Sequence, residues 1–183
     1  HYETNCVMAD VMQGIRLVVR HLVQDGRCCI GFINGPNETS TSAIKLEGFR
    51  LELDLLGISF RPQRVVSAHF YPQAGYLQTK QLLAENPDLD SIIYADDELA
   101  IGGGRALQEA GYRIPADIAI TGFGNYEMGR FASPPLTTVN YDIFEMGIIA
   151  ARRLKMIMDE PDDQNWLIKV PTTLKVRHSS TIG

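Results

Sequence analysis

The sequence predicts an α/β fold in which a parallel sheet carries helices on both faces. Short β-rich runs alternate along the chain with helix-length segments, and this alternation is typical of βαβ units. One run, Cys28–Ile33, is almost continuously apolar, as expected for a strand buried on both faces. The 183 residues are 45% hydrophobic and 21% charged, which is ordinary for a globular domain. A chain of this length can form one substantial core or two small lobes.

The first part of the chain predicts a strand and then a helix. The strand covers Asn5–Ala9, and the helix covers Val11–Gln24, where apolar residues recur at helical spacing. Asp10 is placed to cap this helix, and Gly26 is placed to end it. The apolar strand that follows is interrupted by the turn sequence Asn34–Pro36.

The same alternation continues to the end of the chain. Helical periodicity predicts helices at Ser42–Leu56, Gln73–Glu85, Glu98–Ala110 and Asp142–Asp159. Extended segments are predicted at Val65–Ala68, Ser91–Ala95, Ile118–Gly122, Thr137–Asn140 and Leu167–Val176. Gly57 and Gly111 follow two of these helices, where glycine commonly ends a helix.

The fold class also predicts where a ligand binds. In open parallel sheets, ligands bind outside the carboxyl ends of the strands. This rule selects the loops Asn34–Thr41, Ala68–Tyr71, Ala95–Asp97 and Gly122–Tyr126.

Several functional classes are disfavoured by composition. The net charge is −5 and no basic stripe occurs, so this part of a protein is not expected to bind DNA itself. The cysteines form no C-x-x-C pair and are expected to be reduced thiols, and no apolar run is long enough to cross a membrane. The histidines have no metal-ligand spacing, so neither a metal nor a cofactor is expected.

No catalytic motif is evident, and we do not expect an enzyme. The run Gly102–Gly104 lies in a predicted helix without the G-K-[ST] of a phosphate loop. Its expected role is close backbone packing, or a weakened helix at an interface. A flavodoxin-like or Rossmann enzyme would need a glycine-rich phosphate turn after the first strand, and Asn34–Asn37 is a poor one.

Four strings indicate a family. They are Arg20–Gly26, Tyr94–Gly102 (YADDELAIG), Ala110–Phe123 and Ser133–Val139 (SPPLTTV). Together, in this order, they resemble the effector-binding core of the LacI/GalR family of bacterial transcriptional repressors. The resemblance extends from Val7 to Arg177.

The resemblance implies a core of periplasmic-binding-protein type I, with a ligand held between two lobes, of which this chain is mostly the C-terminal lobe. Residues 1–9 are then a remnant of the first lobe and a crossover, and residues 10–140 are the C-terminal, effector-binding lobe. Residues 141–164 form a helix of the first lobe, and residues 165–183 are the return strand of the C-terminal lobe and a tail. A DNA-binding headpiece and most of the first lobe are expected to precede residue 1.

The resemblance also implies effector-binding positions, which are Asp10, Thr41, Phe70, Asp96 and Asn125. Three of them also have a purely structural interpretation: Asp10 and Thr41 could be helix caps, and Phe70 could be part of the apolar packing. An aromatic face suits a sugar or a purine ring.

Three positions depart from the family pattern. Ala43 stands where sugar-responsive members often have Arg, Gly124 stands where an Asp commonly anchors the ligand, and Tyr141 stands where a polar cleft residue often occurs. Asn125, Asn37 or Glu38 could substitute for the lost contacts. A phosphorylated sugar, a nucleoside or no effector at all therefore remain open.

The predicted function is the effector-binding and dimerisation part of a cytoplasmic repressor. It would sense a small molecule such as a sugar or a sugar derivative, and would bind operator DNA through the absent headpiece. By resemblance, Ile101, Phe131 and Ala132 lie near the interface of a homodimer. The alternative is the solute-binding protein of a sugar transporter with the same architecture.

Overall fold

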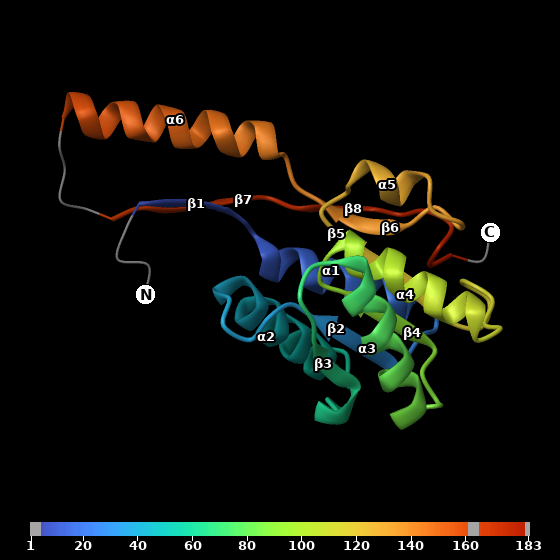
Figure 1. Ribbon diagram of the computed structural model, residues 1–183. Helices are drawn as coiled ribbons and strands as arrows, with labels where there is room; N and C mark the ends of the chain where they lie inside the picture. The colour runs from blue at the N-terminus through green and yellow to red at the C-terminus, as the bar shows by residue number, and fades with distance from the viewer. Residues whose placement is uncertain (1–4, 161–164, 182–183) are drawn as a thin grey trace.

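A computed structural model describes residues 5–160 and 165–181 and confirms the α/β class (Figure 1). The helices are α1 (Val11–Gln24), α2 (Ser40–Leu55), α3 (Pro72–Glu85), α4 (Asp97–Glu109), α5 (Glu127–Arg130) and α6 (Ile143–Asp159), with a 3-10 turn at Pro62–Arg64. The strands are β1 (Cys6–Ala9), β2 (Ile30–Asn34), β3 (Val65–Ser67), β4 (Ser91–Tyr94), β5 (Ala119–Phe123), β6 (Thr137–Asn140), β7 (Leu167–Val170) and β8 (Thr173–Lys175). The segments predicted at residues 1–9, 141–164 and 165–183 include residues 1–4, 161–164 and 182–183, which lie outside the described residues.

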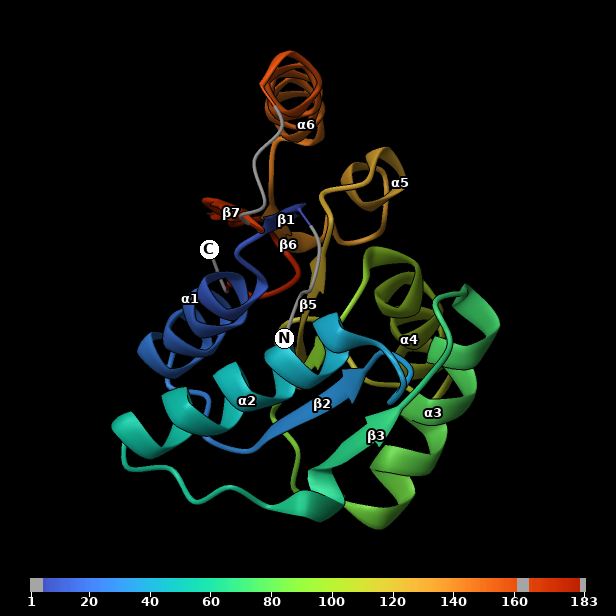
Figure 2. The same cartoon turned by 90° about the vertical axis from the view of Figure 1, so that its left-hand side faces the viewer.

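The main body is a six-stranded sheet with the order β3-β2-β4-β5-β6-β8. All neighbours are parallel except β6 and β8, which are antiparallel. Helices α1 and α2 cover one face, and α3 and α4 cover the other (Figure 2). This topology places the carboxyl ends of β2, β4 and β5 side by side at one edge.

The sheet divides the core into two apolar clusters. Phe32 faces α1 and α2, where its ring lies 5.1 Å from that of Phe49, measured between centroids. Its neighbour Ile33 belongs to the cluster under α3 and α4, with Tyr94 and Leu99. Successive residues of a strand point to opposite faces, so a nearly continuous apolar strand supplies both clusters.

Helices α3 and α4 pack with almost no space between their backbones. A Cβ atom on Gly102 would overlap the carbonyl oxygen of Pro72, and one on Gly75 would overlap that of Leu99. The close-packing interpretation of the glycine run is therefore confirmed. A Cβ on Gly104, in the same helix, would meet only the flexible side-chain ends of Ile120, at 3.3 Å, and Ile114, at 3.8 Å.

A second, smaller unit extends from this body (Figure 1). Strands β1 and β7 pair in parallel as a two-stranded sheet, and α6 lies against β1. Helix α6 has no buried residue, and large apolar side chains such as Phe144 (79% exposed) and Met158 (73% exposed) face outward. A two-stranded sheet with such an open helix is a marginal structure by itself.

The carboxyl-terminal segment departs from the prediction. The sequence predicts one extended segment over Leu167–Val176, whereas the structure divides it at Pro171 and Thr172. Strand β7 pairs with β1, and only β8 joins the large sheet. Proline has no backbone N–H for a sheet, and the N–H of Thr172 donates to Oε1 of Gln13 at 2.9 Å, so the chain changes sheet here.

Smaller differences occur at helix starts. The predicted helix from Ser42 begins two residues earlier, because the side chain of Thr39 accepts from the N–H of Ser42 and caps it. Thr41 is therefore inside the helix and is not its cap. Helix α5 was not predicted, since its four residues are too few for a periodic pattern. No helix in the described part of the chain is long and apolar enough to cross a membrane.

We expect Gly102→Ala to lower the free energy of unfolding by about 1–3 kcal/mol, because the new Cβ must push the backbones of α3 and α4 apart. Gly104→Ala is the matched control, and its change should stay within about 1 kcal/mol because better helix propensity offsets the mild crowding. Urea denaturation followed by circular dichroism measures both, and equal effects would contradict the packing argument.

Candidate functional site

A cleft of about 360 Å³ lies between the carboxyl edge of the large sheet and the small unit that contains β1 and α6. Each of the four loops selected by the topological rule contributes to it, through Thr41, Phe70, Asp96 and Tyr126 among others. The full lining is Val7, Met8, Ala9, Val11, Thr41, Lys45, Phe70, Ala95, Asp96, Phe123, Tyr126, Tyr141 and Met146. The volume suits a small ligand.

Asp96 joins the cleft to helix α4. It directly follows β4, and its Oδ1 accepts from the N–H groups of Glu98 (2.7 Å) and Leu99 (3.3 Å). The residue is therefore the N-cap of α4, and the helix dipole stabilises its negative charge. The cap fixes one carboxylate oxygen and leaves the group at the edge of the cleft.

The next residue, Asp97, is fully buried behind the cleft. Its carboxylate accepts from the hydroxyl of Thr138 (2.6 Å) and from the N–H of Tyr126 (2.7 Å). Burial raises the pKa of Asp97 above its ordinary value, although these two hydrogen bonds and the charge of Arg177 oppose the rise. Gly122 leaves the necessary space, because a Cβ there would overlap the Asp97 carboxylate.

Aromatic side chains form much of the remaining wall. Phe123 and Tyr141 lie 6.0 Å apart between ring centroids, and Phe70 is 39% exposed. Burial raises the pKa of Tyr126, and the neighbouring Asp96 carboxylate raises it further. Burial followed by the charge of Asp96 also raises the pKa of Tyr141, so both phenols stay neutral at physiological pH.

Lys45 is the one ammonium among the described residues that line the cleft, and it is 6% exposed. Its Nζ donates to the carbonyl oxygen of Ala95 at 2.6 Å and lies 4.0 Å from the ring centroid of Phe123. Burial lowers the pKa of Lys45 to about 8, while the charges of Asp96 and Asp97 act in the opposite direction. The side chain therefore stays mostly charged near pH 7.

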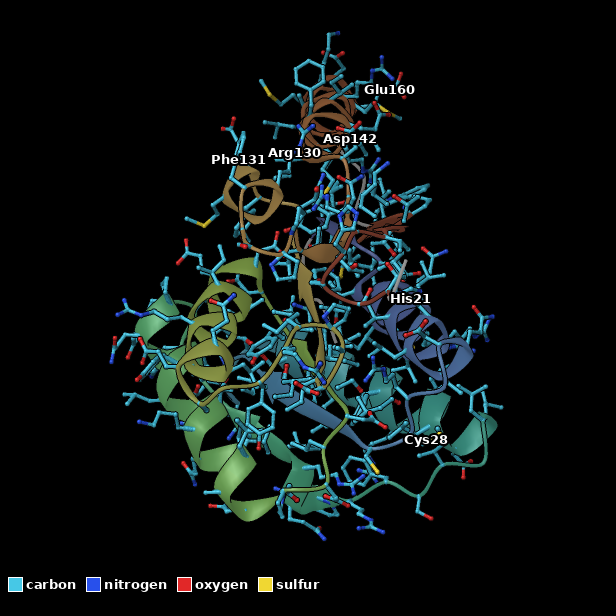
Figure 3. All side chains as sticks on the ribbon, turned by 90° about the vertical axis from the view of Figure 1, so that its right-hand side faces the viewer. His21, Cys28, Arg130, Phe131, Asp142 and Glu160 are labelled. Atoms are coloured by element: carbon cyan, nitrogen blue, oxygen red, sulfur yellow. The ribbon has the colours of Figure 1, made fainter. Side chains whose placement is uncertain are left out.

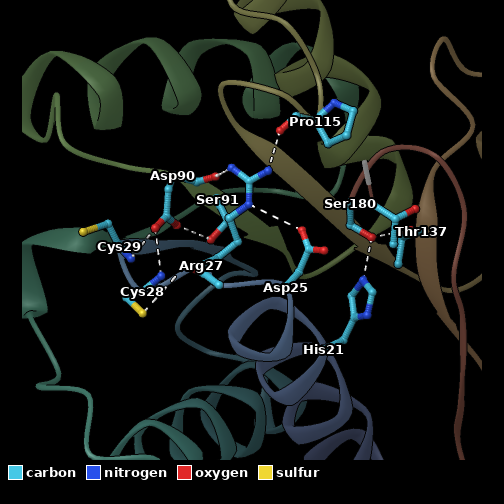
Figure 4. Close-up of polar contacts among 12 residues, drawn as sticks. His21, Asp25, Arg27, Cys28, Cys29, Asp90, Ser91, Pro115, Thr137 and Ser180 are labelled. Atoms are coloured by element: carbon cyan, nitrogen blue, oxygen red, sulfur yellow. Dashed lines mark hydrogen bonds and ion pairs between the residues drawn. The ribbon is translucent and has the colours of Figure 1, made fainter. Parts of the chain in front are cut away.

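The far end of the sheet carries polar contacts of a different kind (Figure 4). Nε2 of His21 lies 2.7 Å from Oγ of Ser180, which also bonds the hydroxyl of Thr137. Burial lowers the pKa of His21, and the charge of Asp25 opposes this. Ser180 is fully buried, so a substrate has no access to its hydroxyl, and the contacts fasten the chain end to α1 and β6.

Comparison with known proteins decides the family. Residues 19–180 match the family described as periplasmic binding protein-like domain. The chain belongs to this family. A relative named HTH-type transcriptional repressor PurR, from Pasteurella multocida, is 29% identical over 96% of this chain and 53% of its own length. A ribose operon repressor from Halalkalibacterium halodurans is 33% identical over 93% of this chain and 50% of its own length.

A solved structure, the transcriptional regulator CelR in complex with cellobiose, superposes with a TM-score of 0.93. It is 28% identical, and the match covers 97% of this chain and 54% of that one. The resemblance drawn from the sequence motifs is thus confirmed. The chain spans about half the length of the curated relatives that it matches.

In this periplasmic binding protein-like domain, Thr41, Phe70 and Asp96 come together as predicted for one site. Asp10 does not join them, because its Oδ1 caps α1 by accepting from the N–H of Gln13 at 3.1 Å. Asn125 is also outside the cleft lining. The helix-cap alternative for Asp10 therefore describes its contacts.

Asn125 has a backbone φ of +53°, in the left-handed region, and its side-chain amide is bonded to residues outside the cleft lining. Its Nδ2 donates to Oδ1 of Asn140 at 2.9 Å, and its Oδ1 accepts from Arg177 at 2.6 Å. These contacts join the loop after β5 to β6 and to the chain end, so the amide is already used.

Sequence reasoning did not select Lys45 or Tyr126 as site residues. Lys45 follows Thr41 by four residues, and this spacing places both side chains on one face of a helix. That signal could have identified Lys45. Tyr126 ends one of the selected loops, and Tyr141, which stood out as a departure from the family, does line the cleft.

Lys45 should give the stability a distinctive pH dependence. Above about pH 8 the folded protein releases this proton, whereas the unfolded chain keeps it to about 10.5. Because the unfolded state then binds more protons, the free energy of unfolding gains up to about 1.4 kcal/mol per pH unit from this group in that window. Lys45→Met lacks this contribution, so its stability relative to the wild type should fall between pH 8 and 10.5. Parallel curves from urea titrations of the two proteins would contradict the assignment.

Proposed function

We propose that this chain is the effector-binding and dimerising part of a bacterial transcriptional repressor that senses a sugar or a sugar derivative. The observation that carries the proposal is the cleft, in which the aromatic face of Phe70 and the polar groups of Asp96 and Thr41 meet at the carboxyl edge of the sheet. An aromatic face buries the apolar side of a sugar ring, while polar groups bond its hydroxyls. The named relatives, which are repressors, favour this function over a transporter's binding protein or an enzyme.

The proposed lobes follow the two sheets. Residues 10–140 and the segment from β8 onward belong to the effector-binding lobe, and β1 and α6 belong to the first lobe. The sequence predicts all of residues 165–183 in the effector-binding lobe, but we assign β7 to the first lobe because it pairs with β1. The cleft lies between these parts, so a ligand there contacts both. A ligand that binds one arrangement of the lobes more tightly shifts the population toward it, and a coupling of about 1–3 kcal/mol gives roughly 5–150-fold regulation.

The other partners are proposed from the same resemblance. Operator DNA is bound by a headpiece that this chain does not contain, in keeping with its net charge of −5. The protein acts in the cytoplasm, where a repressor meets its operator. No cofactor is required for this function.

A thermal-shift screen of the full-length protein tests the function. The panel contains sugars, among them D-ribose and cellobiose, with sugar phosphates, sugar acids, nucleosides and purines. A ligand at a hundredfold excess over its Kd should stabilise the folded state by about 2.7 kcal/mol. Phe70→Ala and Asp96→Ala should abolish the shift, and Leu55→Ala, which alters an exposed side chain on α2, should keep it. The proposal fails if a folded protein responds to nothing in the panel.

Dimerisation is proposed through α4, α5 and the loop after α5, which hold Ile101, Phe131 and Ala132. Phe131 is 80% exposed and Met128 beside it is 47% exposed. Figure 3 shows Phe131 projecting from the end of α5. An exposed apolar group of this kind is typical of a surface that a partner covers.

Phe131→Asp should therefore shift the protein from dimer toward monomer and raise the dissociation constant of the dimer at least tenfold. Analytical ultracentrifugation at several concentrations measures this change. Leu55→Asp introduces the same charge on the exposed face of α2 and should leave the dimer intact. Equal sedimentation of the wild type and Phe131→Asp would exclude this interface.

A further inference from the structure

The ammonium of Lys45 forms no ion pair within contact distance in the described part of the chain. It is 6% exposed, and its one hydrogen bond runs to the neutral carbonyl oxygen of Ala95. Among the described residues, no carboxylate oxygen lies within 4.0 Å of its Nζ. An ammonium has three protons to donate, so two remain for a group in the cleft.

The two nearest carboxylates are engaged elsewhere. Oδ1 of Asp96 accepts hydrogen bonds from two backbone N–H groups of α4, those of Glu98 and Leu99. Asp97 accepts from Thr138 and from the backbone of Tyr126. Their charges act on Lys45 only from a distance, and the positive end of α4 offsets part of them.

Buried charges in proteins are normally paired, because an unpaired ion loses its hydration free energy and gains no compensating interaction. The face of the Phe123 ring, whose centroid lies 4.0 Å from Nζ, attracts the ammonium weakly. The ring does not supply the hydrogen-bond acceptor that an anion would. The Phe70 ring lies farther away, at 6.0 Å. The cleft therefore holds a cation that no carboxylate of the described residues contacts, and a ligand bound there can supply the contacting anion.

We propose that the effector carries an anionic oxygen group, a carboxylate or a phosphate, which pairs with Lys45 in the cleft. This inference rests on the proposed function and makes it more specific. The aromatic side chains beside Lys45 hold the apolar face of the same ligand, and the cleft of about 360 Å³ accommodates a sugar acid or a sugar phosphate.

Isothermal titration calorimetry of the full-length protein at pH 7 tests this inference with matched probes. The probes are D-glucose, D-gluconate and D-glucose 6-phosphate, together with D-ribose, D-ribonate and D-ribose 5-phosphate. We expect binding by an anionic member and not by its neutral parent. The carboxylate and phosphate arms distinguish the two sources of the anion.

Substitutions at Lys45 supply the decisive comparison. Lys45→Met should weaken the anionic probe by at least tenfold, as expected for loss of a charge-assisted hydrogen bond. Lys45→Arg should restore part of the affinity. The matched control is Lys80→Met, which removes an exposed ammonium from α3 outside the cleft and should leave the affinity unchanged. Circular dichroism confirms that each variant is folded.

The pH provides an independent readout. The wild-type affinity for the anionic probe should fall between pH 7 and pH 9 as Lys45 loses its proton, and the Lys45→Arg variant should not show this fall. The tyrosines that face the site, Tyr126 and Tyr141, have raised pKa values and do not titrate in this range.

The possible failures are distinct. If a neutral sugar binds as tightly as its anionic partners, or if Lys45→Met binds the anionic probe as the wild type does, the anionic effector is excluded and the proposed function stands. If no probe in this set or in the wider screen binds the folded protein, the proposed function fails and this inference fails with it.

Discussion

The buried carboxylate of Asp97 is the interaction on which the architecture of the cleft depends. It lies in the first turn of α4, yet its hydrogen bonds run to β6 through Thr138 and to the loop after β5 through Tyr126. One side chain therefore fixes a helix, a strand and a loop relative to each other. A carboxylate that stayed buried without these donors would strongly destabilise the fold.

The groups that face the ligand depend on this junction. Asp96 is held by the N-terminus of α4, and Tyr126 is held at its backbone by Asp97. Lys45 comes from α2, on the other face of the sheet, and reaches the carbonyl of Ala95 between them. The cleft thus combines residues of helices from both faces at one edge of the sheet. The order of strands and helices, and no single loop, brings its polar groups together.

The order of elements and the position of the site could be predicted from the sequence. Apolar runs such as Ile30–Asn34 need both faces covered, and this requirement forces βαβ connections and places the ligand loops. The division at Pro171 could not be predicted from periodicity, because the residues on both sides are extended and only their partners differ. Lys45 was missed for a similar reason: a lysine in an amphipathic helix is usually solvated, and its burial depends on the loop after β4 that packs against it.

The two-stranded unit of β1 and β7 is joined to the large sheet by three chain segments, at Asp10, at Tyr141–Asp142 and at Pro171–Thr172. Two of these segments are bound to each other, since the N–H of Asp10 donates to the carbonyl of Val170 at 2.8 Å and Thr172 bonds the carbonyl of Asp10. The third segment begins beside them, because Asn140 at the end of β6 pairs with Thr173 at the start of β8. All three connections between the small unit and the large sheet therefore lie side by side, so a rotation of one part against the other needs changes in only a few neighbouring backbone torsions.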